Sequence, residues 1–350
     1  MSDGLAIVGQ RAVKLDAAAK ATGRARYVSD LLLPRLLHAR LLRSPHPHAR
    51  VLRVDASAAL ALPGVRAVLS TDNLAERFPD LPSFDPACHE FEREPEGAAL
   101  AGDQRLFDAT VRYAGEPVAA VVAESDAQAR AALDHIAVEY ATLPAVLDAE
   151  QAEAEGAPRL HDGALNNLAG RLSRQVGDVD AALADAALVL ERRFVTSKQK
   201  QAQLEPPCCV AEVAADGKLT VWSPTQAPHR VRLTLARLFG LPLHRVRVVV
   251  PPTGGAFGKN DGVIGEPYAV ALALLLGRPV KLTFSRREDF VGTESRHPTT
   301  TRLTAGFRAD GTIVALRARA GGRRRLPEPQ PGGDRGPAPP ASGPLPHPAC

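Results

Sequence analysis

A glycine-rich loop between a buried strand and an apolar helix is the strongest local constraint on this chain. The loop, PPTGGAFGKND, spans residues 251–261, follows RVRVVV, which is typical of a buried strand, and precedes EPYAVALALLLG, which is typical of a helix. Gly254, Gly255 and Gly258 lack a β-carbon, so a ligand can approach their backbone closely. A helix start nearby offers free amides to negative oxygens. The corner is therefore either a tight structural turn or a binding site.

A nucleotide phosphate loop is the first functional interpretation, but two positions of its motif are not matched in this sequence. That motif needs G-x-x-x-x-G-K followed by serine or threonine. Gly258 and Lys259 fit, but the first position falls on Thr253. The residue after the lysine is Asn260, which lacks the hydroxyl that would hold magnesium. An NTPase is therefore not predicted.

Helices and strands alternate along the chain without a strict βαβ repeat, which predicts an α+β fold in two units. The expected organisation is a lead at 1–21, a first unit at 22–148, a connector at 149–176, a second unit at 177–320 and a tail at 321–350. Strands are expected at 36–44, 49–57, 65–70, 111–125 (with a turn), 188–198, 208–224 (a hairpin), 244–251, 278–290 and 301–320. Helices are expected at 55–64, 126–140 (running into a strand), 177–187 and 227–242.

The tail differs in composition from the rest of the chain. It holds nine prolines in the 25 residues of 326–350 and almost no large apolar side chains. Such a segment cannot bury enough surface to offset its chain entropy, so disorder is predicted.

Composition and charge exclude several classes of protein. Basic residues outnumber acidic ones only 43 to 39, and aromatics make up 4%, so neither a basic face nor stacking aromatics indicate nucleic-acid binding. No apolar stretch reaches the roughly 20 residues that cross a bilayer. The start resembles no secretory signal, so a cytoplasmic protein is expected.

Cysteine and histidine spacing predicts no metal site. No pair among Cys88, Cys208, Cys209 and Cys350 has metal-ligand spacing, and the adjacent Cys208 and Cys209 are expected to be buried thiols. Surface or turn positions are expected for four histidines that lie among prolines and arginines: His46, His48, His229 and His297.

GGAFGKND resembles the GGGFGGKE loop of the molybdenum hydroxylases, which include xanthine dehydrogenase, aldehyde oxidase and bacterial large subunits. Eight further segments resemble this family in the same order, at 22–55, 62–70, 111–125, 138–148, 177–183, 203–213, 219–232 and 278–298. The resemblance covers roughly 22–320 and only the N-terminal half of the family's large subunit. It implies an α/β-hammerhead domain followed by the first part of a molybdopterin-binding domain.

The resemblance also implies which residues face the cofactor. The family's pyranopterin binds molybdenum through its own sulfurs, so no protein ligand to the metal is expected. Gln226 matches the glutamine that donates a hydrogen bond to an oxo ligand of molybdenum. Gly254, Gly255, Phe257 and Gly258 match the loop that closes around the cofactor.

Two acidic residues receive different roles. Asp261 falls at the family's acidic position that holds substrate in purine-oxidising members, but it is one carbon shorter than glutamate and follows a displaced lysine. Purine specificity is therefore open, beside aldehydes, N-heterocycles and aryl-CoA thioesters. Glu205 matches a family position and is assigned a structural role.

The implied function is that of the molybdenum-cofactor subunit of a hydroxylase, with a molybdopterin-type cofactor for which the cytosine dinucleotide form is one option. Iron–sulfur and FAD centres are expected on partner subunits. The general-base glutamate is expected in a C-terminal part that this chain lacks, so the chain alone is expected to be inactive. The tail has the composition of a wrong reading frame, and a frameshift or a natural split would explain it. A reductive relative such as 4-hydroxybenzoyl-CoA reductase, and a non-catalytic fragment that binds partner subunits, are the alternatives.

Overall fold

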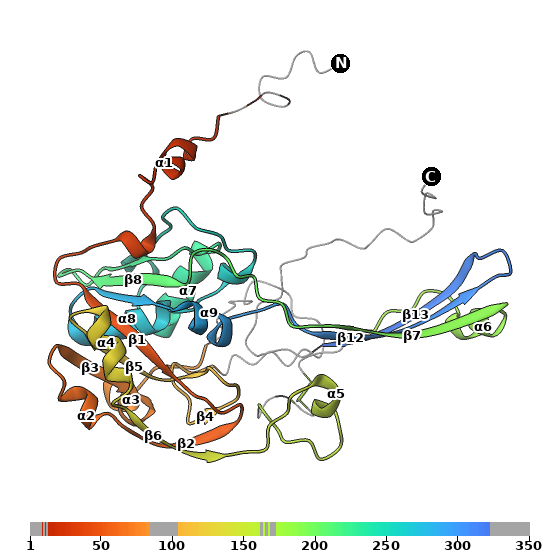
Figure 1. Ribbon diagram of the computed structural model, residues 1–350, viewed down its shortest axis with the longest axis horizontal. Coiled ribbons are helices and arrows are strands. Elements are labelled where there is room, and N and C mark those ends of the chain that lie inside the picture. The colour runs from red at the N-terminus through yellow and green to blue at the C-terminus, as the bar shows by residue number, and fades with distance from the viewer. Residues whose placement is uncertain are drawn as a thin grey trace.

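The computed structural model describes residues 13–84, 104–161 and 173–322, together with residues 9, 11, 164, 167 and 168. These residues form a body of mixed sheets and helices from which a long three-stranded sheet projects (Figure 1). Cys88, Cys350 and the expected disordered tail from residue 323 onward lie outside the described residues.

A seven-stranded mixed sheet forms the centre of the body. Its strand order is β10-β9-β8-β11-β1-β5-β3. The strands are β1 (Leu37–Arg43), β3 (Val65–Ser70), β5 (Pro117–Ala123), β8 (Cys208–Val213), β9 (Leu219–Trp222), β10 (Val246–Val249) and β11 (Val280–Thr283). All seven residues of β5 are buried, which explains its unbroken small apolar sequence PVAAVVA.

Both expected units contribute strands to this one sheet. β1 runs parallel to β11, with Leu37 opposite Val280. Arg40 of β1, itself buried, donates to the backbone oxygen of Thr283 at 2.6 Å and to Asp126 Oδ1 at 2.7 Å. The α+β fold is confirmed, and the two units share one continuous sheet. This sharing was not predicted, because the β1–β11 pairing has no local signal in the sequence.

Two helices cover the second half of the sheet. They are α7 (Pro228–Leu238) and α8 (Glu266–Leu276), and both carry proline near the N-terminus, where the missing N–H costs nothing. Leu272 of α8 packs with Leu219, Leu235 and Leu282 in the main core. Each such leucine contributes about 1.5–3 kcal/mol by leaving water.

A smaller sheet belongs to the first unit alone. Its order is β4-β2-β6, formed by β4 (Thr110–Val111), β2 (Ala49–Asp55) and β6 (Ala137–Thr142). Of the three helices in this unit, α2 (Ser57–Leu60) and α4 (Asp126–Leu133) contact strands of the seven-stranded sheet, and α3 (Thr71–Arg77) contacts both β2 and β3. The turn between β4 and β5 passes close to α9 (Arg286–Gly292), because a β-carbon at Gly115 would lie 2.6 Å from the carbonyl oxygen of Val291.

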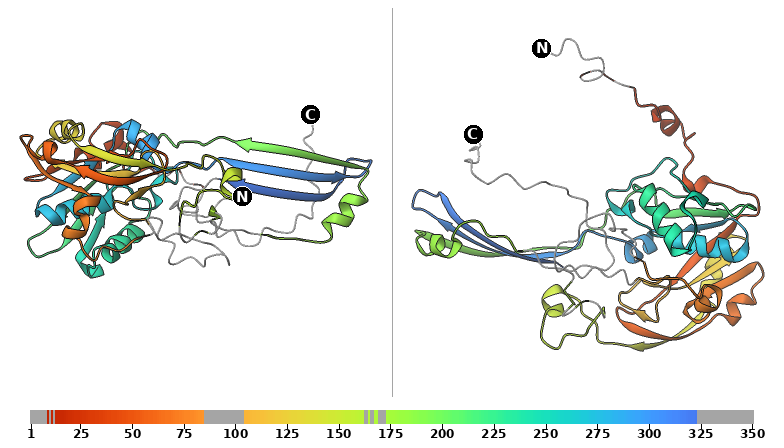
Figure 2. Two further views of the ribbon diagram at one scale, coloured as in Figure 1. Left: turned by 90° about the horizontal axis from the view of Figure 1, so that it is seen from below. Right: turned by 180° about the vertical axis from the view of Figure 1, so that it is seen from behind.

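The projecting sheet, called here the arm, has the order β13-β12-β7. Its strands are β7 (Leu188–Thr196), β12 (Thr299–Phe307) and β13 (Ile313–Gly322), and α5 (Ala149–Ala152) and α6 (Val179–Ala184) lie beside it (Figures 1 and 2). β13 extends two residues past the boundary expected at 320. The remaining short elements are α1 (Ala17–Ala21), η1 (Val28–Asp30), η4 (Leu243–Arg245) and η5 (Lys259–Asp261).

The strand expected over 278–290 is wrong in its second half. β11 ends at Thr283, and α9 begins at Arg286. Ser285 caps this helix: its hydroxyl accepts from Glu288 N at 3.2 Å, and Glu288 Oε2 accepts from Ser285 N at 2.7 Å. This reciprocal capping box starts a helix directly after the strand-like apolar run. None of the described helices is long and apolar enough to cross a membrane.

Candidate functional site

The glycine-rich loop leaves β10 and packs against the segment at 203–205. A β-carbon added to Gly254 would lie 2.6 Å from Glu205 Cβ, and one added to Gly255 would lie 3.0 Å from Gln203 Cβ. Gly255 and Gly258 also have φ angles of 107° and 83°, which L side chains rarely adopt. One side of the loop is therefore fixed by contact with the protein, and it needs glycine to fit there.

Phe257 points away from the core in a strained backbone conformation. Its φ is 54°, and 74% of its surface is exposed. Left-handed backbone costs a residue with a β-carbon roughly 1–2 kcal/mol, and an exposed ring gains no burial in return. Strain of this kind persists where the surrounding structure imposes it and is concentrated at binding sites.

Gln226 is tied to the far end of the same loop. Its backbone N–H donates to the carbonyl oxygen of Asn260 at 2.7 Å, and its side-chain Oε1 accepts from Gly258 N at 3.0 Å. A backbone N–H can only donate, so this contact fixes which end of the amide faces the loop. The Nε2 end, a donor, is the other end of this exposed side chain.

Asp261 lies at the end of η5, close to α7. Its Oδ2 is 3.9 Å from Arg230 Nη1, and both side chains are partly exposed. The expected substrate residue is therefore next to the loop, but a guanidinium lies within ion-pair distance of its carboxylate.

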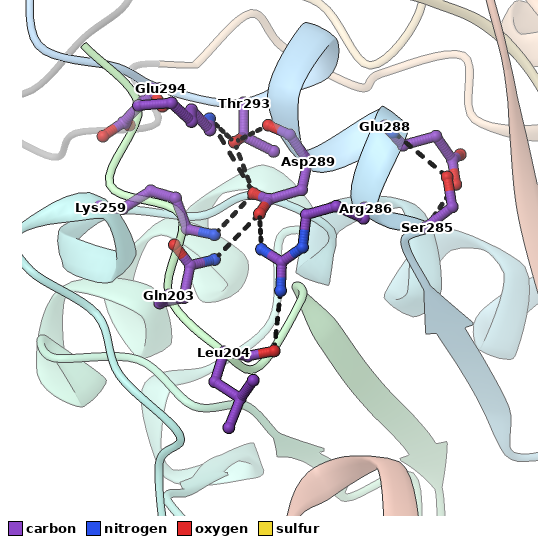
Figure 3. A network of polar contacts seen from close by, with 10 residues as sticks. Gln203, Leu204, Lys259, Ser285, Arg286, Glu288, Asp289, Thr293 and Glu294 are labelled. Carbon is purple, nitrogen blue, oxygen red and sulfur yellow. Dashed lines mark hydrogen bonds and ion pairs between the residues drawn. The ribbon is translucent and has the colours of Figure 1, made fainter.

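A buried ion pair anchors the loop to α9 (Figure 3). Lys259 Nζ lies 2.9 Å from Asp289 Oδ1, and neither side chain is exposed. Asp289 also accepts from Arg286 Nη1 at 2.8 Å, from Gln203 Nε2 at 3.2 Å and from Thr293 Oγ1 at 3.1 Å. One carboxylate thus joins the loop, α9 and the segment at 203–205.

Burial and pairing act in opposite directions on this ion pair. Burial lowers the pKa of Lys259, while its hydrogen bond to Asp289 opposes that change. Burial alone would raise the pKa of Asp289, but the hydrogen bond and charge of Lys259, with the charge of Lys200, bring it below its ordinary value.

Glu205, for which a structural role is predicted, contacts the start of the loop. Its Oε2 accepts from Gly254 N at 2.6 Å, which holds the start of the loop. Burial raises the pKa of this carboxyl. Three buried oxygens beside the loop have no hydrogen-bond donor among the described residues: Gln203 Oε1, Glu205 Oε1 and Asn260 Oδ1.

Cys208 and Cys209 are buried thiols, as the sequence predicts. They line a small cavity behind the loop together with Asn260 and Glu266. Burial raises the pKa of Cys208 to about 11. Within the described ranges, no group of histidine, cysteine and acidic side chains has an arrangement that could hold a metal ion.

His48 is buried, where a surface or turn position was expected. Its Nδ1 lies 2.7 Å from the carbonyl oxygen of Pro144, and this contact offsets the cost of removing the ring from water. His46 contacts the ring of Tyr140 at 4.8 Å between centroids.

The anchor formed by Lys259 and Asp289 is not predicted from the sequence. The signal for it is weak: a lysine inside a glycine loop, and SRRED, which reads as a continuation of a strand. Their pairing joins positions 30 residues apart and becomes visible only once α9 is recognised as a helix.

The fold and the loop are those of a molybdopterin-binding chain. The family model of the molybdopterin cofactor-binding domain matches residues 160–322. That of the a/b hammerhead domain of aldehyde oxidase and xanthine dehydrogenase matches residues 22–144. The chain belongs to the xanthine dehydrogenase and aldehyde oxidase family and corresponds to part of its molybdopterin-binding large subunit.

Individual relatives and solved structures support the same family. The nicotinate dehydrogenase large molybdopterin subunit of Eubacterium barkeri is 31% identical over 89% of this chain and 69% of its own length. The probable hypoxanthine oxidase of Escherichia coli K12 is 30% identical over 90% of this chain but only 36% of its own. Among solved structures, quinoline 2-oxidoreductase from Pseudomonas putida 86 superposes with a TM-score of 0.80 at 33% identity, covering 89% of this chain and 39% of its own. The chain thus spans little more than a third of these last two relatives.

Proposed function

We propose that this chain supplies the metal-facing wall of the cofactor site in a molybdenum hydroxylase. The reaction is R–H + H2O → R–OH + 2H⁺ + 2e⁻, with an aldehyde, a purine or another N-heterocycle as R–H. The observation that carries the proposal is the Gly258 N to Gln226 Oε1 hydrogen bond, which fixes the orientation of an exposed amide beside a strained glycine loop. The relatives named as oxidases, hydroxylases and dehydrogenases do not favour the reductive alternative.

The residues fit a molybdenum cofactor. When bound, that cofactor supplies the two-electron oxidation chemistry, and its oxo groups are hydrogen-bond acceptors. The Nε2 of Gln226 is a donor whose direction is set by the opposite end of the amide. Gly254 and Gly255 leave no room for side chains, so backbone forms the wall. Glu205 and the Lys259–Asp289 pair fix the backbone of this loop in place before a ligand binds.

We also assign roles to Phe257, Gly258 and Asp261. Phe257 covers the outer side of the site and excludes water from it, which strengthens every polar contact inside. Gly258 adopts the left-handed backbone that turns its N–H toward Gln226. Asp261 lies on the substrate side, where it accepts a hydrogen bond from a ring N–H once its contact with Arg230 lengthens.

The remaining parts of the proposal concern other polypeptides. A two-electron oxidation needs an electron outlet, and we assign it to an iron–sulfur subunit and an FAD subunit. Names such as large subunit and large chain mark several relatives as members of multi-subunit assemblies. The proton-abstracting glutamate is assigned to large-subunit sequence that this chain does not span. The cytosine dinucleotide form of the cofactor and the cytoplasmic location stay predictions.

Metal analysis of the assembled protein tests this function. Protein purified with its partners from cells supplied with molybdate should hold about one molybdenum per chain and should oxidise aldehydes or purines with a dye as acceptor. The isolated chain of 350 residues should show no turnover. An assembly without molybdenum would favour the non-catalytic fragment, and full turnover by the isolated chain would contradict the assignment of the base to another polypeptide.

A further inference from the structure

Asn260 of η5 lies where the glycine-rich loop meets the segment that leads into α7. Its side-chain Nδ2 donates to the carbonyl oxygen of Pro224 at 3.0 Å. A carbonyl oxygen can only accept, so this bond fixes which end of the amide faces Pro224. The backbone carbonyl of Asn260 accepts from Thr225 Oγ1 at 3.1 Å and from Gln226 N at 2.7 Å. One residue therefore contacts three consecutive residues of the segment.

Thr225 extends this contact to the start of α7. Its side chain is buried, and its Oγ1 accepts from Ala227 N at 3.0 Å while donating to Asn260. Ala227 is the N-cap residue of α7. The backbone is therefore held on both sides of Gln226, at Thr225 before it and at Ala227 after it.

Gln226 itself has an exposed side chain, whose Oε1 accepts from Gly258 N at 3.0 Å. A long side chain at the surface loses rotamer freedom when it keeps one direction, so its backbone must be well placed for the contact to persist. Asn260 fixes that backbone and lies two residues after Gly258 in the same loop. Both ends of the Gln226–Gly258 hydrogen bond thus depend on Asn260.

We propose that Asn260 is the positioning residue of Gln226. Its side chain is only 6% exposed and its Nδ2 is engaged by Pro224, so it acts through Gln226 and not by touching a ligand. By holding residues 224–226 against the loop, it sets the direction of the Gln226 Nε2 donor. The inference rests on the proposed function, in which that donor faces the molybdenum cofactor.

Hydrogen exchange with mass spectrometry tests the contact without any measurement of activity. In the full chain purified with its partners, Asn260→Ala should speed amide exchange in peptides that cover residues 224–230 and 254–261. Peptides from β5, all of whose residues are buried, should keep their exchange rates, whereas a generally destabilised fold would exchange faster there too.

The matched control is Asn73→Ala in α3. Asn73 Nδ2 also donates to a carbonyl oxygen, that of Val68, at 2.9 Å, and its Oδ1 accepts from Ser70 N at 2.9 Å. This variant loses comparable hydrogen bonds in the first unit. It should leave exchange over 224–230 and 254–261 unchanged.

A double-mutant cycle on turnover tests the positioning role itself. Loss of one hydrogen bond predicts that Asn260→Ala lowers kcat roughly 2- to 10-fold. In the Gln226→Ala background the same change should have no further effect, because the group that Asn260 positions is already gone. A separate structural role would instead multiply the two losses.

Multiplied losses in the cycle, or unchanged exchange over 254–261, would overturn the proposal. If Asn260→Ala fails to fold, Thr225→Val removes the hydroxyl that joins Asn260 to Ala227 and is measured in the same two ways. An assembly that holds no molybdenum would contradict the proposed function, while the exchange rates would still decide whether Asn260 holds the segment at Gln226.

Discussion

Lys259 Nζ lies 2.9 Å from Asp289 Oδ1, with both side chains fully enclosed. Lys200 and Arg286 approach the same carboxylate at 3.9 Å and 2.8 Å. The Asp289 carboxylate thus lies within ion-pair distance of three cations, so Asp289 and Lys259 contribute unequally to the network.

Removing the anion should therefore cost more than removing one cation. Asp289→Asn removes the carboxylate charge that Lys259, Arg286 and Lys200 share and should destabilise the protein by about 3–5 kcal/mol. Lys259→Met leaves Asp289 paired with Arg286 and should cost roughly 1–3 kcal/mol. Urea unfolding measures both, with the exposed Asp134→Asn as control. Equal losses would show that the network is not centred on Asp289.

Gln226→Ala should lower turnover more than it lowers bound molybdenum in the assembled protein. One lost hydrogen bond to a charged group is worth about 1.5–3 kcal/mol, or roughly 10- to 150-fold in rate. Gln175→Ala, an exposed glutamine far from the loop in sequence, is the control. Normal turnover of the Gln226 variant at full metal loading would remove Gln226 from the site.

Phe257 offers a direct measure of backbone strain. Phe257→Gly and Phe257→Ala both delete the exposed ring, but only glycine relaxes the φ of 54°. The glycine variant should be about 1 kcal/mol more stable than the alanine variant. Thermal unfolding decides, and an alanine variant of equal or greater stability would show that the left-handed conformation is not maintained.

The lowered pKa of Glu124 predicts that the stability of the protein depends on pH in the acidic range. Hydrogen bonds from Arg278, at 2.9 and 3.0 Å, and from Arg66, at 2.6 Å, lower the pKa of Glu124 to about 2. A lowered folded-state pKa stabilises the protein above the ordinary value of 4.5, and this stability is lost as the pH falls toward 2.

The stability difference between wild type and Glu124→Gln should consequently be constant above pH 4.5 and shrink between pH 4.5 and 2. Unfolding by urea across that range measures it. A difference for Glu124→Gln that is independent of pH would contradict the shifted pKa.

Local signals in the sequence predicted local structure well. The helix expected at 126–140, running into a strand, is found as α4 followed by β6. The hairpin expected at 208–224 is found as β8 and β9, joined by a turn at Asp216 and Gly217. The glycine loop was located because a strand, three glycines and a helix follow in order. These features depend on residues a few positions apart.

Long-range contacts were not predictable in the same way. The pairing of Leu37 with Val280 and of Lys259 with Asp289 leaves no periodic trace in the chain. The capping box at Ser285 was present in the sequence, but the strand-like KLTF before it obscured the change to a helix. Gln226 was assigned by resemblance alone, and its role at the cofactor stays a prediction; its contact with Gly258 could not be predicted from the sequence.

The parallel pairing of β1 with β11 has a consequence for how the chain reaches its native state. Partners such as Leu37 and Val280 are separated by most of the polypeptide, so closing this ladder must await the synthesis of both ends. Contacts of such high sequence separation slow folding. Until they form, β1 and β11 present open strand edges to the surroundings, and we expect neither family-matched segment to fold on its own. We expect a chaperone requirement during synthesis to follow from this one strand pair.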